Sequence, residues 1–157
     1  MVARGNIQTR QRLLEERLTG LDPRVLAVYE RMHAREIAYR KQVFKRYPAL
    51  RVNQIPDRSH RRVCTSVVRR WLRERQIFAF IHRRHFWFPA FEFAVGEPKP
   101  VVQEILHLIR PLHGWEAMFW FVGANGWLEG DAPVDVLDVD PVAVVVAASH
   151  ANDMIGG

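Results

Sequence analysis

Arginine and hydroxyl side chains recur on one side of a predicted helix over residues 60–75, whose sequence is HRRVCTSVVRRWLRER. Three arginines and a serine follow one another at spacings of 4, 3 and 4, and these are Arg62, Ser66, Arg69 and Arg73. Positions three and four residues apart share one face of a helix. Arginine can donate two parallel hydrogen bonds to a guanine edge, and serine commonly contacts phosphates. The face therefore suits a nucleic acid, and a solvated basic surface is the alternative.

A predicted β-hairpin follows this helix and adds two arginines. From residue 77 the apolar period changes from helical to alternating, which predicts strands over 77–81 and 85–88 with a turn between them. Arg83 and Arg84 would lie at the tip, as in the wing of a winged helix-turn-helix domain. The candidate DNA contacts come from the helix and the tip, and these are Arg61, Arg62, Thr65, Ser66, Arg69, Arg70, Arg73, Arg83 and Arg84.

Aromatic residues line both predicted strands and allow another interpretation of this surface. They are Phe78, Phe80, Phe86, Trp87 and Phe88. Aromatic rings can stack on unpaired bases, so an RNA surface is an alternative to duplex DNA. Because side chains alternate across a strand, at least half of these rings should point into a core. We expect Phe86 and Phe88 to hold the hairpin against its helix.

The sequence contains no motif for catalysis or metal binding. Its histidines are scattered, and it has no H-E-x-x-H, C-x-x-C, G-x-S-x-G or phosphate-binding glycine loop. His82 and His85 flank the predicted turn, but a metal site needs further ligands that the sequence does not offer. We therefore expect no enzyme activity, no cofactor and no metal. The single cysteine, Cys64, excludes an internal disulfide, and we expect it on the buried face of its helix with Val67, Val68 and Trp71.

The charges divide the chain into a basic and an acidic part. Residues 1–85 contain 21 Lys and Arg against 7 Asp and Glu, whereas residues 86–157 contain 2 against 10. The net charges are +14 and −8. A basic segment suits a polyanionic partner, because neutralising phosphates releases counterions. With a glycine and two prolines marking a linker at residues 96–100, we expect a basic DNA-binding region over 1–93 and an acidic helical domain over 98–157.

Helical periodicity and capping residues predict the other elements. A helix is expected over residues 7–19, and a second should begin after Asp22, with Pro23 at its first position, and end near residue 46. Residues 49–58 predict only a short helix or turn, after which Ser59 would cap the helix over 60–75. Further helices are expected over 100–110, 114–122 and 133–137, and from Pro141, with Asp140 as its cap.

These elements predict a mainly α fold. N-terminal helices would precede a helix-turn-helix-like unit with a β-hairpin wing, and a small helical domain would follow. The chain has 157 residues, of which 48% are hydrophobic, so it can bury a core. No apolar run approaches the roughly 18 residues of a membrane span, and the N-terminus lacks a secretory signal. We expect a cytoplasmic protein without membrane contact.

Large aromatic residues are concentrated in the acidic part. The stretch GWEAMFWFVGANGWLEGDAPVDVLD, residues 114–138, contains three of the five tryptophans. A bundle this small would bury so many large side chains only with difficulty. They could all be core, or some could form an exposed interface, since protein interfaces favour Trp and Phe.

Together with the stretch FPAFEF at residues 88–93, this pattern resembles the Xre/MbcA/ParS toxin-binding family of bacterial antitoxins. The matching positions are Phe88, Pro89, Phe91, Phe93, Trp115, Trp120, Asn125, Trp127, Leu128, Gly130, Pro133 and Leu137, and the closing helix around Val144 to Ala148. The resemblance implies a C-terminal helical domain that binds a cognate toxin, commonly of the NAD-consuming RES type. It also implies an N-terminal DNA-binding part that represses its own operon.

On this resemblance, we expect an antitoxin of a type II toxin–antitoxin system. The implied partner-binding residues are Trp115, Trp120, Asn125, Trp127, Leu128, Glu129, Asp131, His150, Asn152 and Asp153. A homo-oligomer, most simply a dimer, should form through helices of residues 98–150, and a flexible polar tail should reach into the toxin. The alternatives are a stand-alone DNA-binding transcription regulator without a toxin and an RNA-binding module.

Overall fold

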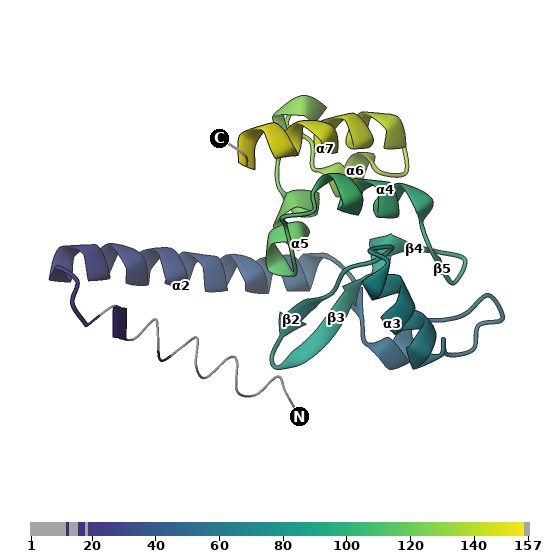
Figure 1. The fold of residues 1–157 in the computed structure, drawn as a ribbon, viewed down its shortest axis with the longest axis horizontal. Helices are drawn as coiled ribbons and strands as arrows, with labels where there is room; N and C mark the ends of the chain where they lie inside the picture. The colour runs from purple at the N-terminus through teal and green to yellow at the C-terminus, as the bar shows by residue number, and fades with distance from the viewer. Residues whose placement is uncertain (1–11, 13–15, 18, 156–157) are drawn as a thin grey trace. The chain divides into compact units, whose positions relative to one another are not determined.

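The computed structural model describes residues 12, 16–17 and 19–155, with backbone alone for residues 152–155. Most of the helix expected over residues 7–19 lies outside the described residues. The chain divides into two compact units, residues 1–42 and 43–157. The fold is mainly helical with small antiparallel sheets, which confirms the predicted class (Figure 1).

The elements of the first half are α2 (Pro23–Arg46), β1 (Ala49–Leu50), η1 (Val52–Gln54), α3 (Thr65–Arg73), β2 (Phe80–His82) and β3 (His85–Pro89). Those of the second half are η2 (Ala90–Glu92), β4 (Phe93–Ala94), β5 (Glu97–Pro98), α4 (Pro100–Leu108), α5 (Trp115–Val122), η3 (Gly126–Leu128), α6 (Pro133–Val136) and α7 (Pro141–Ile155). Elements labelled η are single 3₁₀ turns.

Helix α2 begins as the sequence predicts. The Asp22 carboxylate accepts a hydrogen bond from the Arg24 N–H at 2.7 Å, and Pro23 occupies the first helical position, where no N–H is needed. An ion pair between Glu36 and Arg40 supports the middle of the helix. The helix ends at Arg46, two residues before Pro48.

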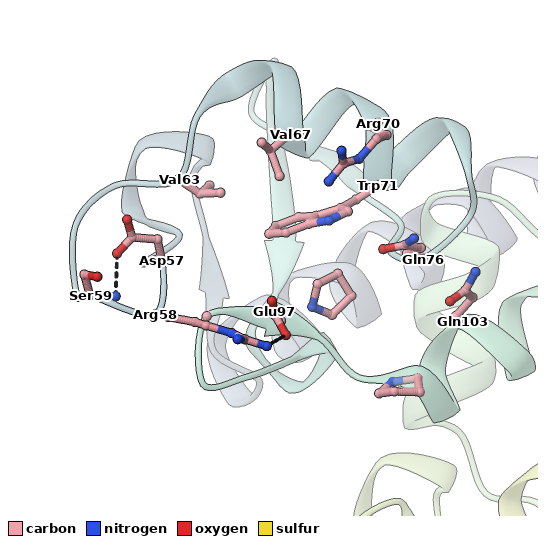
Figure 2. A pocket seen from close by; sticks show the side chains of 13 residues that line it. Asp57, Arg58, Ser59, Val63, Val67, Arg70, Trp71, Gln76, Glu97 and Gln103 are labelled. Carbon is pink, nitrogen blue, oxygen red and sulfur yellow. Dashed lines mark hydrogen bonds and ion pairs between the residues drawn. The ribbon is translucent and has the colours of Figure 1, made fainter.

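Helix α3 begins five residues later than the predicted helix over 60–75. The Asp57 carboxylate accepts hydrogen bonds from the N–H groups of Ser59 and Arg61, both at 2.8 Å, and the first of these is drawn in Figure 2. The Val63 N–H also donates to the Ile55 carbonyl at 3.0 Å. These bonds hold the residues before α3 in a closed loop. Ser59 is therefore a loop residue, and the prediction that it caps the helix is wrong.

The buried face of α3 is only partly the predicted one. Val68 and Trp71 are buried, as expected. Cys64 is exposed, because it precedes the first helical turn and does not belong to the helix. A hydrogen bond with the Ser66 hydroxyl lowers the pKa of the Cys64 thiol.

Arg75 lies two residues beyond the end of α3 and connects this helix to α4. Its backbone lies in the left-handed region, with φ 53°, and the next N–H, of Gln76, donates to the Trp71 carbonyl at 2.8 Å. This is the usual arrangement at a helix C-terminus, although glycine is more common there. The Arg75 guanidinium donates from Nη2 to the Leu106 carbonyl oxygen at 3.0 Å. Arg75 thereby links the C-terminal end of α3 to α4.

The predicted hairpin forms, with a third strand that the sequence did not reveal. Strands β2 and β3 pair antiparallel with His82 opposite His85, which leaves Arg83 and Arg84 as a two-residue turn. Strand β2 starts at Phe80, three residues after the predicted start. The short strand β1 pairs with the other edge of β3, so the sheet order is β1-β3-β2.

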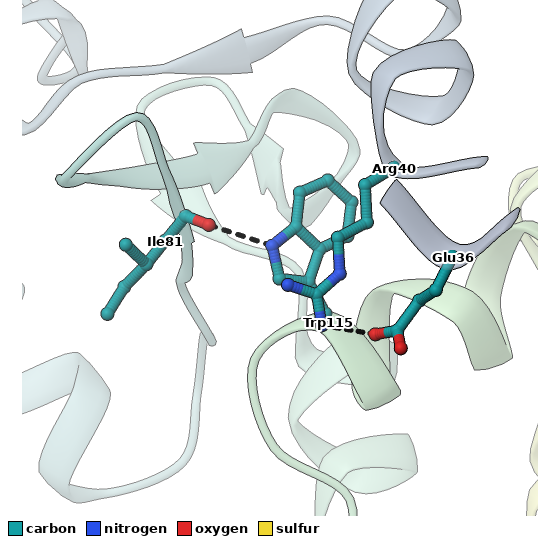
Figure 3. A network of polar contacts seen from close by, with 4 residues as sticks. All are labelled: Glu36, Arg40, Ile81 and Trp115. Carbon is teal, nitrogen blue, oxygen red and sulfur yellow. Dashed lines mark hydrogen bonds and ion pairs between the residues drawn. The ribbon is translucent and has the colours of Figure 1, made fainter. Parts of the chain in front are cut away.

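The two faces of the hairpin pack against different groups of residues. Phe88 joins Ile55, Val68, Trp71 and Ile77 in a small core under α3. Phe80 belongs to the larger core formed with the C-terminal helices. Trp115 connects this core to the hairpin, because its Nε1–H donates to the carbonyl oxygen of Ile81 at 2.7 Å (Figure 3). Phe86 is 61% exposed, so the expectation that it holds the hairpin against α3 is wrong.

The boundary expected between a basic and an acidic domain is bridged by one core. The rings of Phe78 and Phe121, from opposite sides of the boundary, stack with centroids 5.7 Å apart. The expected linker is the tight β4–β5 hairpin. A Cβ atom at Gly96 would lie 2.5 Å from the Asp57 carbonyl carbon, so this hairpin contacts the loop before α3 closely. The charge division therefore does not coincide with a domain division.

The C-terminal helices follow the sequence closely. α4, α5, α6 and α7 form over the expected segments, and the Asp140 carboxylate accepts the Ala143 N–H at 3.1 Å at the start of α7. α7 lies against α4 (Figure 1). It continues to Ile155, so residues 151–155, which we expected to belong to a flexible tail, are helical. Within the described part of the chain, every helix is too short or too polar to cross a membrane.

The carboxyl group of Glu92 is fully buried. The Oε1 atom of Glu92 accepts the Phe78 N–H at 2.6 Å, and no partner for Oε2 is found among the described residues. Burial raises the pKa of Glu92 well above its ordinary value. A neutral carboxylic acid is the form that fits such a site, since an ionised carboxylate would be buried without a counter-charge.

We expect Glu92→Gln to remove a pH dependence of stability. Because the folded-state pKa of Glu92 is raised, unfolding releases a proton above the ordinary value of 4.5, and the wild type should lose stability as the pH rises. Glutamine keeps the acceptor for Phe78 and does not titrate. The free energy of unfolding of the variant minus that of the wild type should therefore increase as the pH rises, by at most about 1.4 kcal/mol per pH unit. Urea titrations between about pH 5 and pH 8 measure it, and a constant difference would contradict the prediction.

Candidate nucleic-acid interface

A groove of about 530 Å³ lies between α3 and the β2–β3 hairpin, and we call it the α3–hairpin groove. It is lined by Arg51, Val52, Thr65, Val68, Arg69, Leu72, Ala79, Arg84, His85, Phe86 and Phe88. These residues come from the segment before α3, from α3 itself and from the hairpin. The helix and the hairpin thus share one concave surface.

Three arginines from three elements converge on this groove. Arg69 comes from α3, Arg84 from the hairpin turn, and Arg51 from the residue before η1. Two contacts hold the Arg51 side chain. Its Nη2 atom lies 3.1 Å from Nδ1 of His85, and its guanidinium carbon lies 5.4 Å from the centroid of the Trp87 ring. None of the described residues that line the groove is acidic. The groove is therefore suited to an anionic ligand.

An aromatic ring adds an apolar wall to the basic groove. Phe86 lies on the same side of β3 as the buried Phe88, and it extends the apolar surface outward past the core. Val68 and Leu72 of α3 complete the apolar lining. Aromatic rings beside arginines are typical of surfaces that contact bases as well as phosphates.

The tip of the hairpin holds its arginines in a costly conformation. Arg83 and Arg84 have φ angles of 48° and 67°. Two-residue turns of this kind prefer Asn-Gly or Gly-Gly, because the left-handed region costs other residues about 1–2 kcal/mol each. Strain of this kind is common at functional positions. The sequence therefore keeps two positive charges at the tip at the expense of stability.

All nine residues predicted to contact DNA are exposed. Thr65, Arg69 and Arg84 line the α3–hairpin groove. Arg61 and Arg62 lie in the loop before α3, so the expectation that Arg62 continues the polar face of the helix is wrong. Ser66 and Arg73 are on the exposed side of α3, and Arg70 lines a different pocket.

Sequence reasoning missed Arg51 and His85 as members of the interface, and it considered Phe86 only for the alternative RNA surface. Arg51 and His85 are 34 positions apart, and only the pairing of β1 with β3 brings them together. Alternation along β3 places Phe86 on the same side as the buried Phe88, and therefore predicts that both are buried. Phe86 is nevertheless exposed, because alternation does not show how much of the strand another element covers.

The pocket lined by Arg70 lies on the other side of α3 and has a volume of about 540 Å³. Figure 2 shows Trp71 and Arg70 projecting from α3 toward Arg58 and Glu97, which form an ion pair at its edge. Residues of the loop before α3 and of the β4–β5 hairpin also line this pocket. Because this ion pair is solvent-exposed, it contributes little to stability.

A second candidate surface lies on the C-terminal helices, and we call it the Trp127 pocket. It has a volume of about 380 Å³ and is lined by Trp120, Ala124, Asn125, Gly126, Trp127, Ala147, His150 and Ala151. The Trp127 and His150 rings are stacked with centroids 3.7 Å apart, and Trp127 is 58% exposed. The Asn125 side chain fixes the loop by accepting the Trp127 N–H at 2.9 Å.

The structure separates the residues predicted to bind a partner into two groups. Trp120, Asn125, Trp127 and His150 meet in the Trp127 pocket. Glu129 and Asp131 are exposed in the loop that follows η3. Trp115 and Leu128 are buried in the core, so their side chains do not reach the surface. Asn152 and Asp153 are in the last turns of α7, and their side chains lie outside the described residues.

The described residues include no group of three His, Cys, Asp or Glu side chains that could hold a metal ion. His82 stacks on Phe44 with centroids 4.0 Å apart, and burial lowers the pKa of its imidazole. His85 contacts Arg51. Both histidines that flank the hairpin turn are thus engaged by neighbouring side chains.

Comparison with known proteins finds no matching family model, no matching curated protein and no matching solved structure. The function of this chain is therefore argued from its own residues and geometry.

Proposed function

We propose that this protein binds double-stranded DNA with α3 and the β2–β3 hairpin. The observation that carries the proposal is the convergence of Arg51, Arg69 and Arg84 on one groove. Arginines from separate elements can contact successive phosphates or a guanine edge at the same time. An exposed helix beside a basic hairpin is also the arrangement with which winged helix-turn-helix proteins contact duplex DNA.

Two features favour a binding surface over an ordinary solvated one. The arginines at the tip are retained in a strained turn, and Phe86 is exposed in a groove that arginines also line. Neither feature benefits the fold, because the turn costs free energy and the ring leaves apolar surface in water. Phe86 also makes RNA the alternative ligand, since a ring of this kind can stack on unpaired bases.

The test of the proposal is the salt dependence of DNA binding. Arg69→Ala with Arg73→Ala should weaken binding and lower the slope of log K against log salt by about 1–2, because each lost phosphate contact releases roughly one counterion less. Fluorescence anisotropy with a labelled duplex at several salt concentrations measures both quantities.

A matched control separates this surface from the general charge of the protein. Lys41→Ala with Lys45→Ala removes the same charge from exposed positions on α2. We expect this variant to keep most of the affinity and the slope. An equal loss in both variants would place the DNA surface elsewhere, and tighter binding of a single-stranded RNA than of the duplex would favour the RNA alternative.

We further propose that the Trp127 pocket binds a protein partner, which makes the chain an antitoxin-like regulator. An exposed tryptophan stacked on a histidine beside an apolar pocket has the composition of an interaction hot spot. In the antitoxin interpretation the partner is a cognate toxin of the NAD-consuming RES type, and DNA binding represses the operon that encodes both. The alternative is a stand-alone transcription regulator.

Trp127→Ala should weaken capture of the neighbouring gene product at least about tenfold, as expected for a hot-spot tryptophan. Co-expression with the protein encoded beside it, followed by affinity capture and titration, measures this loss. Val139→Ala is the control, because it changes an exposed apolar residue outside the pocket. Equal capture by both variants would exclude the pocket, and a neighbouring gene product that does not bind at all would favour the stand-alone regulator.

A further inference from the structure

Helix α2 exposes a row of apolar side chains at coiled-coil spacing. Val25, Val28 and Met32 are three and four residues apart, and Met32 is 64% exposed. With heptad positions lettered a to g, Val25 is at a, Val28 at d and Met32 at a of the next heptad. Tyr39 is at a of the heptad after that. Of the residues of α2, only Val43 is buried. A long helix draws most of its stability from packing of its apolar side, so such a row indicates a partner.

The charges beside this row are complementary to those of an identical helix in parallel orientation. In the same heptads Arg24 and Arg31 occupy position g, and Tyr29 and Glu36 occupy position e. In a parallel pair, each g residue faces the e residue five positions later on the other helix. Arg31 would then face Glu36 of the second copy, and Arg24 would lie against the Tyr29 ring of the second copy. Two-fold symmetry forms each contact twice.

An antiparallel pair would be opposed by the same charges. In that orientation position g faces position g, so the arginines at positions 24 and 31 would meet one another. Like charges in such positions act against the wrong pairing. Arg35 at a d position weakens either arrangement, and it favours a reversible dimer over a permanent one.

We infer that α2 forms a parallel, in-register coiled coil with a second copy of this chain. The exposed Val25–Val28–Met32 row is the seam, and the Arg31–Glu36 pairs set the orientation. The dimer requires neither DNA nor the Trp127 pocket. It places self-association on α2, in contrast to the expected association through helices of residues 98–150.

A charge exchange tests both the interface and its orientation. Arg31→Glu and Glu36→Arg should each raise the dimer dissociation constant about tenfold, because each variant pairs like charges in its own homodimer. An equimolar mixture of the two variants should recover wild-type dimerisation, since opposite charges then meet in the heterodimer. Sedimentation equilibrium over a concentration series measures all four samples. A monomeric wild type, or single variants that dimerise as well as the wild type, would overturn the inference.

Cysteine cross-linking tests the register without relying on charge. In a Cys64→Ser background, Met32→Cys should form an intermolecular disulfide under mild oxidation, because a residue at position a meets its own copy in a parallel pair. Glu30→Cys is the control, since position f points away from the seam. Circular dichroism confirms that each variant is folded. Equal cross-linking of the two variants would overturn the in-register coiled coil.

Discussion

Replacing the hairpin tip by Arg83→Asn with Arg84→Gly is expected to stabilise the fold and to weaken DNA binding in the same variant. Both arginines have positive φ angles, and Asn-Gly is the pair that such a turn prefers. Relief of the strain should raise the free energy of unfolding by on the order of 1 kcal/mol. The loss of two phosphate contacts should lower the affinity by one to two orders of magnitude at about 0.1 M salt.

Opposite changes in stability and affinity distinguish a functional tip from a structural one. Urea titration measures the first quantity, and anisotropy with a duplex measures the second. Arg83→Lys with Arg84→Lys is the matched control, because it keeps both the charge and the unfavourable conformation. We expect this control to resemble the wild type in both measurements. A tip variant with unchanged affinity would show that the hairpin does not contact DNA.

Replacing Trp71 by alanine should destabilise the protein by about 3–5 kcal/mol, which is the usual cost of a buried Trp-to-Ala change. Trp71 is 7% exposed and packs with Val68, Ile77 and Phe88 under α3. Its ring also lies 6.2 Å from that of Phe93, centroid to centroid. The cavity left behind would separate α3 from the hairpin, so the α3–hairpin groove should be lost together with stability.

Denaturant titration of Trp71→Ala, with Trp127→Ala beside it, measures this effect. Trp127 is the largely exposed tryptophan, so its removal should cost less than about 1 kcal/mol. Both variants replace tryptophan by alanine, so the difference between their free energies of unfolding reflects burial and not the kind of substitution. A loss below about 1 kcal/mol for Trp71→Ala would mean that the small core contributes little to the fold.

A parallel dimer on α2 would have a consequence for recognition if the proposed DNA binding holds. A two-fold dimer presents two α3–hairpin grooves, so its preferred sites would be two half-sites related by symmetry. The variants Arg31→Glu and Glu36→Arg then separate the effect of dimerisation from that of the groove. They should lose binding to paired half-sites while retaining binding to a single half-site, because the groove residues are unchanged.

Local chemistry in the sequence determined the start of α2, the helices of the acidic half and the position of the hairpin turn. Each depends on residues within one or two helical turns. Asp22 and Pro23 begin α2, Asp140 caps α7, and the change of apolar period locates the hairpin. Such signals act between neighbours in the chain, so they can be read from the sequence.

Tertiary pairing decided where α3 begins and which aromatic residues are exposed. The segment before α3 reads as a helix, but the β4–β5 hairpin packs against it, with Gly96 close to the Asp57 backbone and Glu97 paired with Arg58, and the segment forms a loop. Trp115 and Trp127 belong to the same aromatic stretch, yet one is in the core and the other is exposed. Periodicity shows that a side chain lies on an apolar face, but it does not show whether another element covers that face.

The charge pattern gave a boundary that packing does not follow. A division between a basic and an acidic part is a property of the surface, whereas a domain is defined by its core, and one core joins Phe78 to Phe121 across the boundary. The candidate DNA interface shows the same limit. The sequence by itself determined the arginines of α3 and of the turn, because they follow local spacing. Only the pairing of β1 with β3 added Arg51 and His85, because contacts between segments 34 residues apart depend on the order of strands in the sheet.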